Sequence, residues 1–247
     1  MQHLLEGFGP IGLAEMDTVA LTNRIDTKFV FHQSLLPVLL PELQQSYRIL
    51  TIDDCREHPY DTLYFDDPQF GMYLAHHNQR GSRYKLRLRR YGSSSINYME
   101  MKRKTNTGRT VKSRKKTTAF GEALTAEQLQ FFREVTGQQE QEWKFATRIT
   151  FQRITLVSLD PPERMTLDLN LTFANEHTSK SFGNLIVAEV KQGSKAPSAF
   201  IKIIKSHHVA PFSISKYCLG LSLLRPELKH NLFKRQQLTI HQIQSRA

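Results

Sequence analysis

The sequence has few cysteines and no long apolar segment, and both absences narrow its possible class. Only two cysteines, Cys55 and Cys218, occur in 247 residues, too few for a disulfide framework or a four-cysteine zinc site. No apolar run approaches the ~20 residues that a transmembrane helix requires. The N-terminus lacks the basic and apolar regions of a secretory signal. We therefore expect a cytoplasmic protein with no membrane span.

Acidic residues are scarce relative to basic ones. The chain has 34 lysines and arginines against 23 aspartates and glutamates, which gives a net charge of +11. An excess of this sign favours a polyanionic partner, such as nucleic acid, a phosphorylated ligand or an acidic membrane surface. The hydrophobic fraction of 39% supports a real core and excludes wholesale disorder.

Motifs for nucleophilic catalysis and phosphate-binding loops are also missing. There is no Gly-x-Ser-x-Gly sequence. The glycine-rich segment 7–12 lacks the Lys-Ser/Thr that follows a P-loop. The histidines of the pairs 76–77 and 207–208 are adjacent rather than one helical turn apart, so we interpret them as core or surface residues. Covalent catalysis by a protein side chain is therefore not expected.

The middle of the chain has the pattern of an antiparallel sheet with helices before and after it. Strands are predicted at 61–66, 72–76, 83–91, 96–104, 109–118, 145–158, 163–173 and 184–192. The capping box Thr125-Ala126-Glu127-Gln128 and Gly137 bound one helix. Further helices are predicted at 198–207 and 213–223, and at 34–46 with a kink or break at Pro41. We expect one α+β domain over residues 1–247, with a core at about 21–220 and a helical extension at 226–247.

Alternating positions within the predicted strands are strongly basic. Lys85, Arg87 and Arg89 share one face of their strand, while Leu86 and Leu88 occupy the other. The same alternation places together Arg24, Asp26 and Lys28; Glu100, Lys102 and Lys104; Lys112, Arg114 and Lys116; and Glu189 and Lys191. Taken alone, each row is typical of a solvated face.

The opposite faces of these strands are apolar and must be buried, and the predicted helices can pack on them. If the helices pack outside, the charged rows line the interior of a closed antiparallel β-barrel. The lysine and arginine side chains that line such an interior repel one another unless an anion lies between them. The carboxylates Glu100, Asp168 and Glu189 would then pair with the bases or hold a divalent metal, and oxygen ligands suit Mg²⁺ or Mn²⁺.

The order of these segments resembles the VTC (vacuolar transporter chaperone) polyphosphate polymerase domain, a branch of the triphosphate tunnel metalloenzyme superfamily. The matching segments are 23–29, 62–66, 85–92, 99–104, 111–114, 151–153, 164–168, 188–191 and 215–217. The resemblance implies a closed β-tunnel that holds a linear phosphate chain. It also implies transfer of the γ-phosphoryl group of ATP onto a growing polyphosphate, with Mn²⁺ or Mg²⁺ as cofactor.

Position by position, the resemblance assigns roles to fifteen residues. The catalytic residues that grip the phosphates would be Lys28, Arg87, Arg89, Lys102, Arg153, Arg164 and Lys216, the last near the tunnel mouth. Further phosphate-binding residues would be Arg24, Lys85, Lys104, Lys112, Arg114 and Lys191. Glu189 would be the metal ligand, with Glu100 as a second carboxylate. Arg148 is an alternative to Arg153, because a slip of one residue in strand register reverses the faces.

The expected partners are ATP and inorganic polyphosphate or pyrophosphate, with no DNA or RNA; a membrane-protein partner is not readable from the sequence. Two alternatives stay open. A tunnel triphosphatase would use the same cradle with water as the acceptor. A non-catalytic module would bind polyphosphate or nucleic acid, although a nucleic-acid binder favours aromatic side chains among the bases. Tyr84 and Tyr98 fall on opposite faces relative to their neighbouring bases, so no stacking platform is evident.

Overall fold

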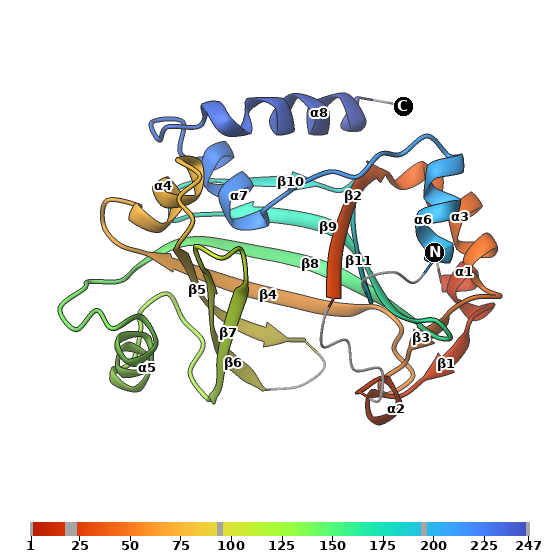
Figure 1. Cartoon of the computed structure of the whole chain (residues 1–247), viewed down its shortest axis with the longest axis horizontal. Helices are drawn as coiled ribbons and strands as arrows, with labels where there is room; N and C mark the ends of the chain where they lie inside the picture. Colours follow the sequence, from red (N-terminus) through yellow and green to blue (C-terminus); the bar gives the residue numbers. More distant parts are fainter. Residues whose placement is uncertain (1, 18–23, 93–95, 194–196, 246–247) are drawn as a thin grey trace.

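An eleven-stranded, mostly antiparallel sheet forms the framework of the protein (Figure 1). The computed structural model describes residues 2–17, 24–92, 96–193 and 197–245. The strands are β1 (Gly9–Ile11), β2 (Arg24–His32), β3 (Arg48–Leu50), β4 (His58–Asp66), β5 (Arg83–Tyr91), β6 (Asn97–Lys104), β7 (Thr110–Thr117), β8 (Lys144–Leu159), β9 (Pro162–Ala174), β10 (Ser179–Phe182) and β11 (Leu185–Gly193). The predicted α+β class is confirmed.

The predicted closed barrel is wrong, because the sheet curves without closing. Its main strands run in the order β2-β11-β9-β8-β4-β5-β6-β7, and no pairing joins β2 to β7 within the described ranges. Both end strands cross the long central strands β8, β9 and β4 steeply in Figure 1. Part of the free edge of β2 is already occupied, since the backbone N–H of Phe212 donates to the Lys28 carbonyl at 2.7 Å. The two basic end strands would also repel each other without an anion between them.

Helices on the back of the sheet bury its apolar face. Helices α1 (Gln2–Glu6), α3 (Leu36–Leu43) and α6 (Ala199–Ser206) lie behind β2, β11 and β9, where Phe29, Leu167 and Phe200 join one core cluster. Helix α5 (Ala126–Thr136) covers β5 and β6 through Phe132, which is fully buried against Leu86 and its neighbours. Short segments α2 (Leu13–Asp17) and the 3₁₀ turns Gln33–Leu35 and Asn231–Phe233 complete the connections.

Helix α7 (Lys216–Leu224) packs on the front of the sheet and fills one end of its concave side. A bulge prepares β9 for this contact: two β9 residues oppose one of β8 where Asn170 has a φ of 53°. The bulge turns Phe173 toward α7, and a Cβ at Gly220 would lie 2.7 Å from that ring. Helices α4 (Gly71–His77) and α8 (Lys234–Gln244) pack beside α7.

Most of the predicted elements are confirmed. The three strands from 83 to 118 form the expected meander, and the capping box is present, with the Thr125 side chain accepting from the Gln128 N–H. A helix lies in the tail, as predicted. The strand predicted at 72–76 is wrong, because this segment is α4. The Asp66 carboxylate accepts hydrogen bonds from the N–H groups of Met72 and Tyr73, which satisfies the first turn of a helix there.

Candidate functional site

One face of the sheet carries the charged residues predicted from the sequence. Cross-strand pairs share a face, and the register joins Lys28 to Glu189, Arg153 to Asp168, and Arg87 to Glu100. This surface, which we call the basic face, includes Arg24, Lys28, Arg83, Lys85, Arg87, Arg89, Lys102, Lys104, Lys112, Arg114, Lys116, Arg153, Arg164 and Lys191, the carboxylates Asp26, Glu100, Asp168 and Glu189, and Lys216 at the start of α7. The apolar opposite faces are covered by helices, as expected.

Glu100 is the central anion of the β5–β7 part of this face. Its carboxylate accepts from Arg87 Nε at 2.7 Å, lies 2.8 Å from Lys112 Nζ, and has Arg89 and Arg114 at 3.7 and 3.6 Å. The Glu100 side chain has no solvent exposure. Burial alone would raise its pKa, but the cations, Arg87 foremost, hold the pKa of Glu100 well below its usual range. Glu100 is therefore ionised and fully occupied by cations.

Asp168 is the corresponding central anion on the long strands β8 and β9. Arg153 donates to it from Nε and Nη2 at 2.6 and 2.8 Å, and the Lys216 ammonium donates to the same carboxylate. This two-point arginine contact fixes the guanidinium plane. Burial would raise the pKa of Asp168, but Arg153 and Lys216 lower it below its usual range.

Arg153 and Arg148 are separated by the strand register. Arg153 lies on the basic face, whereas Arg148 pairs with Asp61, whose Oδ1 accepts from Arg148 Nε at 2.9 Å. Asp61 alternates with Tyr60 and Thr62 along β4 and so points to the back of the sheet. Of the two arginines, the structure therefore places Arg153, and not Arg148, on the basic face.

Glu189 is the most accessible of the three inner carboxylates. Its side chain is 22% exposed, against 0% for Glu100 and 2% for Asp168. Lys28 Nζ lies 3.8 Å away and Lys191 donates to it. Burial opposes ionisation, but Lys191 and Lys28 lower the pKa of Glu189 well below its usual range. A negative charge at this position is therefore available to a ligand.

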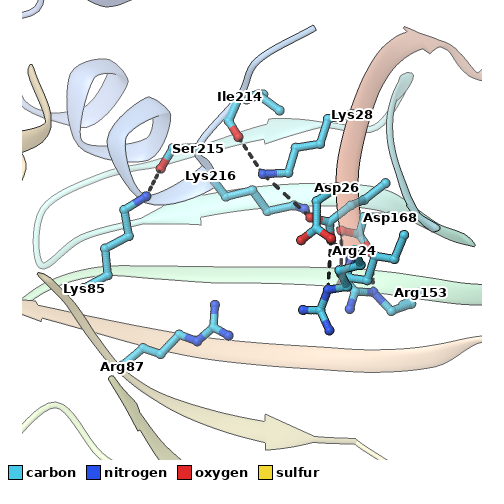
Figure 2. A network of polar contacts seen from close by, with 12 residues as sticks. Arg24, Asp26, Lys28, Lys85, Arg87, Arg153, Asp168, Ile214, Ser215 and Lys216 are labelled. Atoms are coloured by element: carbon cyan, nitrogen blue, oxygen red, sulfur yellow. Dashed lines mark hydrogen bonds and ion pairs between the residues drawn. The ribbon is translucent and has the colours of Figure 1, made fainter. Parts of the chain in front are cut away.

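The segment 211–215, which we call the strap, directly precedes α7 and contacts β2, at one end of the sheet, and β5. Figure 2 shows Lys28 and Lys85 reaching it from opposite ends: Lys28 Nζ donates to the Ile214 carbonyl at 3.2 Å, and Lys85 Nζ donates to Ser215 Oγ at 2.8 Å. Ser215 is also the N-cap of α7, where its side chain accepts from the Cys218 N–H. The strap thus orders two bases that come from β2 and β5, strands that are not neighbours in the sheet.

Lys102 lies among like charges. Its side chain is reached by solvent, yet its pKa falls to about 7, first because Arg87 is close and then because of partial burial and Arg89. Glu189 raises the pKa of Lys102 in the opposite direction. A lysine whose pKa is near 7 carries only part of its charge at neutral pH. A bound anion raises that pKa, and the ammonium becomes fully charged.

The remaining predicted bases lie toward the margins of the basic face. Arg24 pairs with Asp26 at 3.0 Å, Arg164 donates to the Met16 carbonyl at 3.3 Å, and Lys104 is exposed near the end of β6. The structure therefore leaves these three at the edge and holds Lys85 at the strap, while the inner bases gather around Glu100, Asp168 and Glu189.

Aromatic residues of the basic face were missed by the sequence analysis. Tyr64 accepts a hydrogen bond from Arg87 Nη1 at 3.0 Å, and the Tyr60 ring lies beside Arg89 and Arg153. The alternation of Tyr60 and Tyr64 with Asp61, Leu63 and Phe65 along β4 was the available signal. The nearest thiol, Cys218, is buried, and burial raises its pKa, which makes it a poor nucleophile.

Among the three inner carboxylates of the basic face, only Glu189 is placed to bind a metal ion, and it would do so together with substrate phosphates. Within the ranges that the structure describes, no three histidine, cysteine, aspartate or glutamate side chains gather into a metal-binding cluster. Glu100 and Asp168 are each surrounded by cations, whereas Glu189 is partly accessible. Mg²⁺ is commonly bound by one or two carboxylates together with substrate phosphates and water. Glu189 fits such a site.

Bases on the basic face far outnumber its carboxylates, so the face carries a large excess of positive charge. A curved surface with excess positive charge attracts anions and raises their local concentration. Arginine and lysine together suit phosphate oxygens, arginine through two-point contacts and lysine as a point charge. The site can bind a multiply charged phosphate compound and stabilise charge that develops on it.

Comparison with known families gives a match to the VTC domain over residues 23–225. The match covers most of the chain and confirms the resemblance found in the sequence. Comparison with curated protein sequences gives no significant match. No helix of the described segments is long and apolar enough to cross a membrane.

Solved structures share the fold at low sequence identity. A candidate adenylate cyclase of Bacillus halodurans is 14% identical, with a TM-score of 0.50 over 78% of this chain and 94% of that one. A candidate adenylyl cyclase of Hippeastrum, HpAC1, for which a dominant triphosphatase activity is described, is 15% identical, with a TM-score of 0.49 over 85% of this chain and 98% of that one. At this identity the likeness to the Bacillus protein concerns the fold alone.

Proposed function

The chain belongs to the VTC domain family, and on that basis we propose that it is a divalent-metal-dependent polyphosphate polymerase. It would transfer the γ-phosphoryl group of ATP onto the end of a growing inorganic polyphosphate. The observation that carries the proposal is the charge of the basic face. Its excess of positive charge is spread over seven strands and the start of α7, which suits a phosphate chain longer than a single triphosphate.

The inner bases would bind and orient the phosphates. Arg87 and Arg89 lie on β5 and Lys102 on the neighbouring β6, all on the basic face, and they would bind phosphate groups side by side. Phosphoryl transfer depends mainly on in-line positioning and on neutralising charge on the transferred group, and it needs no protein nucleophile. Arg153 and Lys216, both fixed by Asp168, would hold the chain beside the central strands.

Glu189 is the proposed metal ligand, and Glu100 is proposed to organise the arginines instead. Glu100 is enclosed by four cations, while Glu189 is accessible from the basic face. Glu189 would hold Mn²⁺ or Mg²⁺, which when bound would supply positive charge to stabilise the transferred phosphoryl group. The lysines Lys28 and Lys191 beside Glu189 would contact the same phosphates.

Incubation of the purified protein with ATP and Mn²⁺ tests the proposal. Gel electrophoresis resolves long phosphate polymers, and a colorimetric assay measures orthophosphate in the same samples. Polymers that increase in length with time support a polymerase, whereas orthophosphate without polymer would replace it by a triphosphatase. If ATP is not consumed with any divalent metal, the non-catalytic binding module takes its place.

A matched pair of variants shows whether the basic face is the site. Lys102 and Arg103 are neighbours on β6, and their side chains point to opposite faces of the sheet. Lys102→Ala should lower ATP turnover at least tenfold and weaken tripolyphosphate binding. Arg103→Ala removes the same charge from the back, where Arg103 lies over Tyr84, and should change neither.

A further inference from the structure

The arginines of the basic face are held in two different ways. Arg87 and Arg153 are held by carboxylates: Arg87 donates to Glu100 and Tyr64, and Arg153 donates to Asp168 from two nitrogens. Each such bond uses a donor and offsets part of the positive charge. These two guanidiniums therefore have fewer donors left for a phosphate.

Arg153 also lies over two aromatic rings, with its guanidinium carbon 4.6 Å from the Tyr60 centroid and 5.1 Å from that of Phe151. Arg89 and Arg114 differ from Arg87 and Arg153 in their contacts to a carboxylate. Their contacts to Glu100 measure 3.7 and 3.6 Å, which is longer than a hydrogen bond. Arg89 Nε is buried and has no hydrogen-bond partner in the described part of the chain. Both guanidiniums lie instead over aromatic rings.

These rings belong to an aromatic row that crosses four neighbouring strands. It consists of Phe151 on β8, Tyr60 on β4, Tyr91 on β5 and Tyr98 on β6, with neighbouring centroids 5.2, 5.0 and 5.6 Å apart. The register places all four on the basic face, because Tyr60 is opposite both Phe151 and Tyr91, and Tyr98 is opposite Arg89. The Phe151 end of the row reaches α7, where Lys216 Nζ lies 4.9 Å from the Phe151 ring centroid.

Each of the two arginines contacts this row. The Arg114 guanidinium carbon lies 3.4 Å from the Tyr98 ring centroid and 5.5 Å from that of Tyr91. The Arg89 guanidinium carbon lies 5.7 Å from the Tyr60 centroid and 6.0 Å from that of Tyr91. All four distances are within the range of cation–π attraction.

We infer that the aromatic row positions Arg89 and Arg114 for phosphate, and that Tyr98 is the positioning residue for Arg114. The inference rests on the proposed function, since it concerns the same anion site. A ring holds a guanidinium through its π face and leaves the N–H donors in the guanidinium plane free. A carboxylate would hold the same group but would compete with the substrate for those donors. The row thus fixes these guanidinium groups without using their N–H donors.

The inference predicts that the ring of Tyr98, and not its hydroxyl, supports binding. Tyr98→Leu should weaken tripolyphosphate binding about three- to tenfold, the range expected for loss of a partly desolvated cation–π contact. Tyr98→Phe keeps the ring and should bind as the wild type does. The matched control is Tyr84→Leu, which removes the ring beside Arg103 on the back of the same hairpin and should not change binding. Isothermal titration calorimetry at fixed ionic strength measures each dissociation constant.

A double-mutant cycle separates positioning from general damage to the fold. If Tyr98 acts through Arg114, Tyr98→Leu should have almost no further effect in an Arg114→Gln background. An equal loss in both backgrounds would overturn the inference, and so would wild-type binding by Tyr98→Leu. If the wild type itself does not bind tripolyphosphate, the proposed function fails, and this outcome is distinct because it precedes any comparison of variants. Circular dichroism melting curves show whether each variant is folded.

Discussion

Lys102 on β6 and Glu189 on β11 interact electrostatically although four strands lie between theirs in the sheet. In a flat sheet with neighbouring strands ~4.8 Å apart, the two side chains would be more than ~20 Å from each other. The charge of Glu189 nevertheless raises the pKa of Lys102. The curvature of the sheet therefore brings the proposed metal ligand and a proposed phosphate-binding base to one site.

Glu189→Gln should separate catalysis from binding. The substitution keeps the shape of the side chain but removes the charge that would hold the metal. Mn²⁺-dependent consumption of ATP should fall at least a hundredfold, while tripolyphosphate binding stays the same or becomes tighter, because a repulsive charge is lost. Steady-state kinetics and calorimetry on the same preparation check both parts. Wild-type turnover by this variant would show that the metal site lies elsewhere.

Lys102 should make ligand binding depend on pH. Its pKa of about 7 lies below the ordinary lysine value, so the free protein loses this charge as the pH rises through 7. A bound polyanion favours the charged form and raises the pKa again. Tripolyphosphate affinity should therefore fall between pH 6 and pH 8.5, with net proton uptake on binding near pH 7.5.

The Lys102→Met variant is the control for this prediction. It has no group to titrate at that position, so its affinity should be lower and its pH profile flatter than that of the wild type. Calorimetry in two buffers of different ionisation enthalpy counts the protons taken up. Equal pH profiles for wild type and variant would assign the dependence to another group, or to the phosphate itself.

Glu100→Gln should destabilise the free protein and make it depend on ligand. The substitution leaves Arg87, Arg89, Lys112 and Arg114 without their shared anion. Removal of one partner from a buried ion pair costs about 3–5 kcal/mol. The melting temperature should fall, and millimolar tripolyphosphate should restore more of it than it adds to the wild type.

Glu127→Gln provides the comparison. Glu127 forms an exposed pair with Lys115 at 3.1 Å, and exposed pairs contribute little to stability. Its melting temperature should stay within about one degree of the wild type. A Glu100→Gln variant that melts like Glu127→Gln would show that Glu100 does not organise the arginines.

The basic face could be predicted from the sequence because its signal is local. Side chains alternate along a strand, and cross-strand pairing keeps each alternate set on one face, so the Lys85–Arg87–Arg89 row already indicated where the bases lie. The choice between Arg148 and Arg153 could not be made, because it depends on the register between β8 and β9.

Closure of the sheet and the identity of α4 could not be predicted for a related reason. Whether β2 meets β7 depends on two edges that are far apart in sequence, and on the strap that bonds to Lys28. The segment 72–76 has residues that suit a strand, but Asp66 supplies the cap that makes it a helix. Non-local contacts and side-chain caps override local propensity in both places.

Ser215 combines two tasks, and its removal should affect stability and binding together. Its side chain caps α7 through the Cys218 N–H and accepts a hydrogen bond from Lys85 Nζ. Ser215→Ala should lower the free energy of unfolding by about 1 kcal/mol through loss of the cap. It should also weaken tripolyphosphate binding, because the Lys85 ammonium loses the partner that fixes it on the basic face.

Ser198→Ala shows which part of this effect belongs to the cap. Ser198 caps α6 in the same way, accepting from the Ile201 N–H, but α6 covers the back of the sheet. Both variants should lose similar stability in urea unfolding, and only Ser215→Ala should bind tripolyphosphate more weakly in calorimetry. Equal binding by the two variants would mean that Lys85 is positioned by its strand alone. In that case the strap would serve only to hold α7 against the sheet.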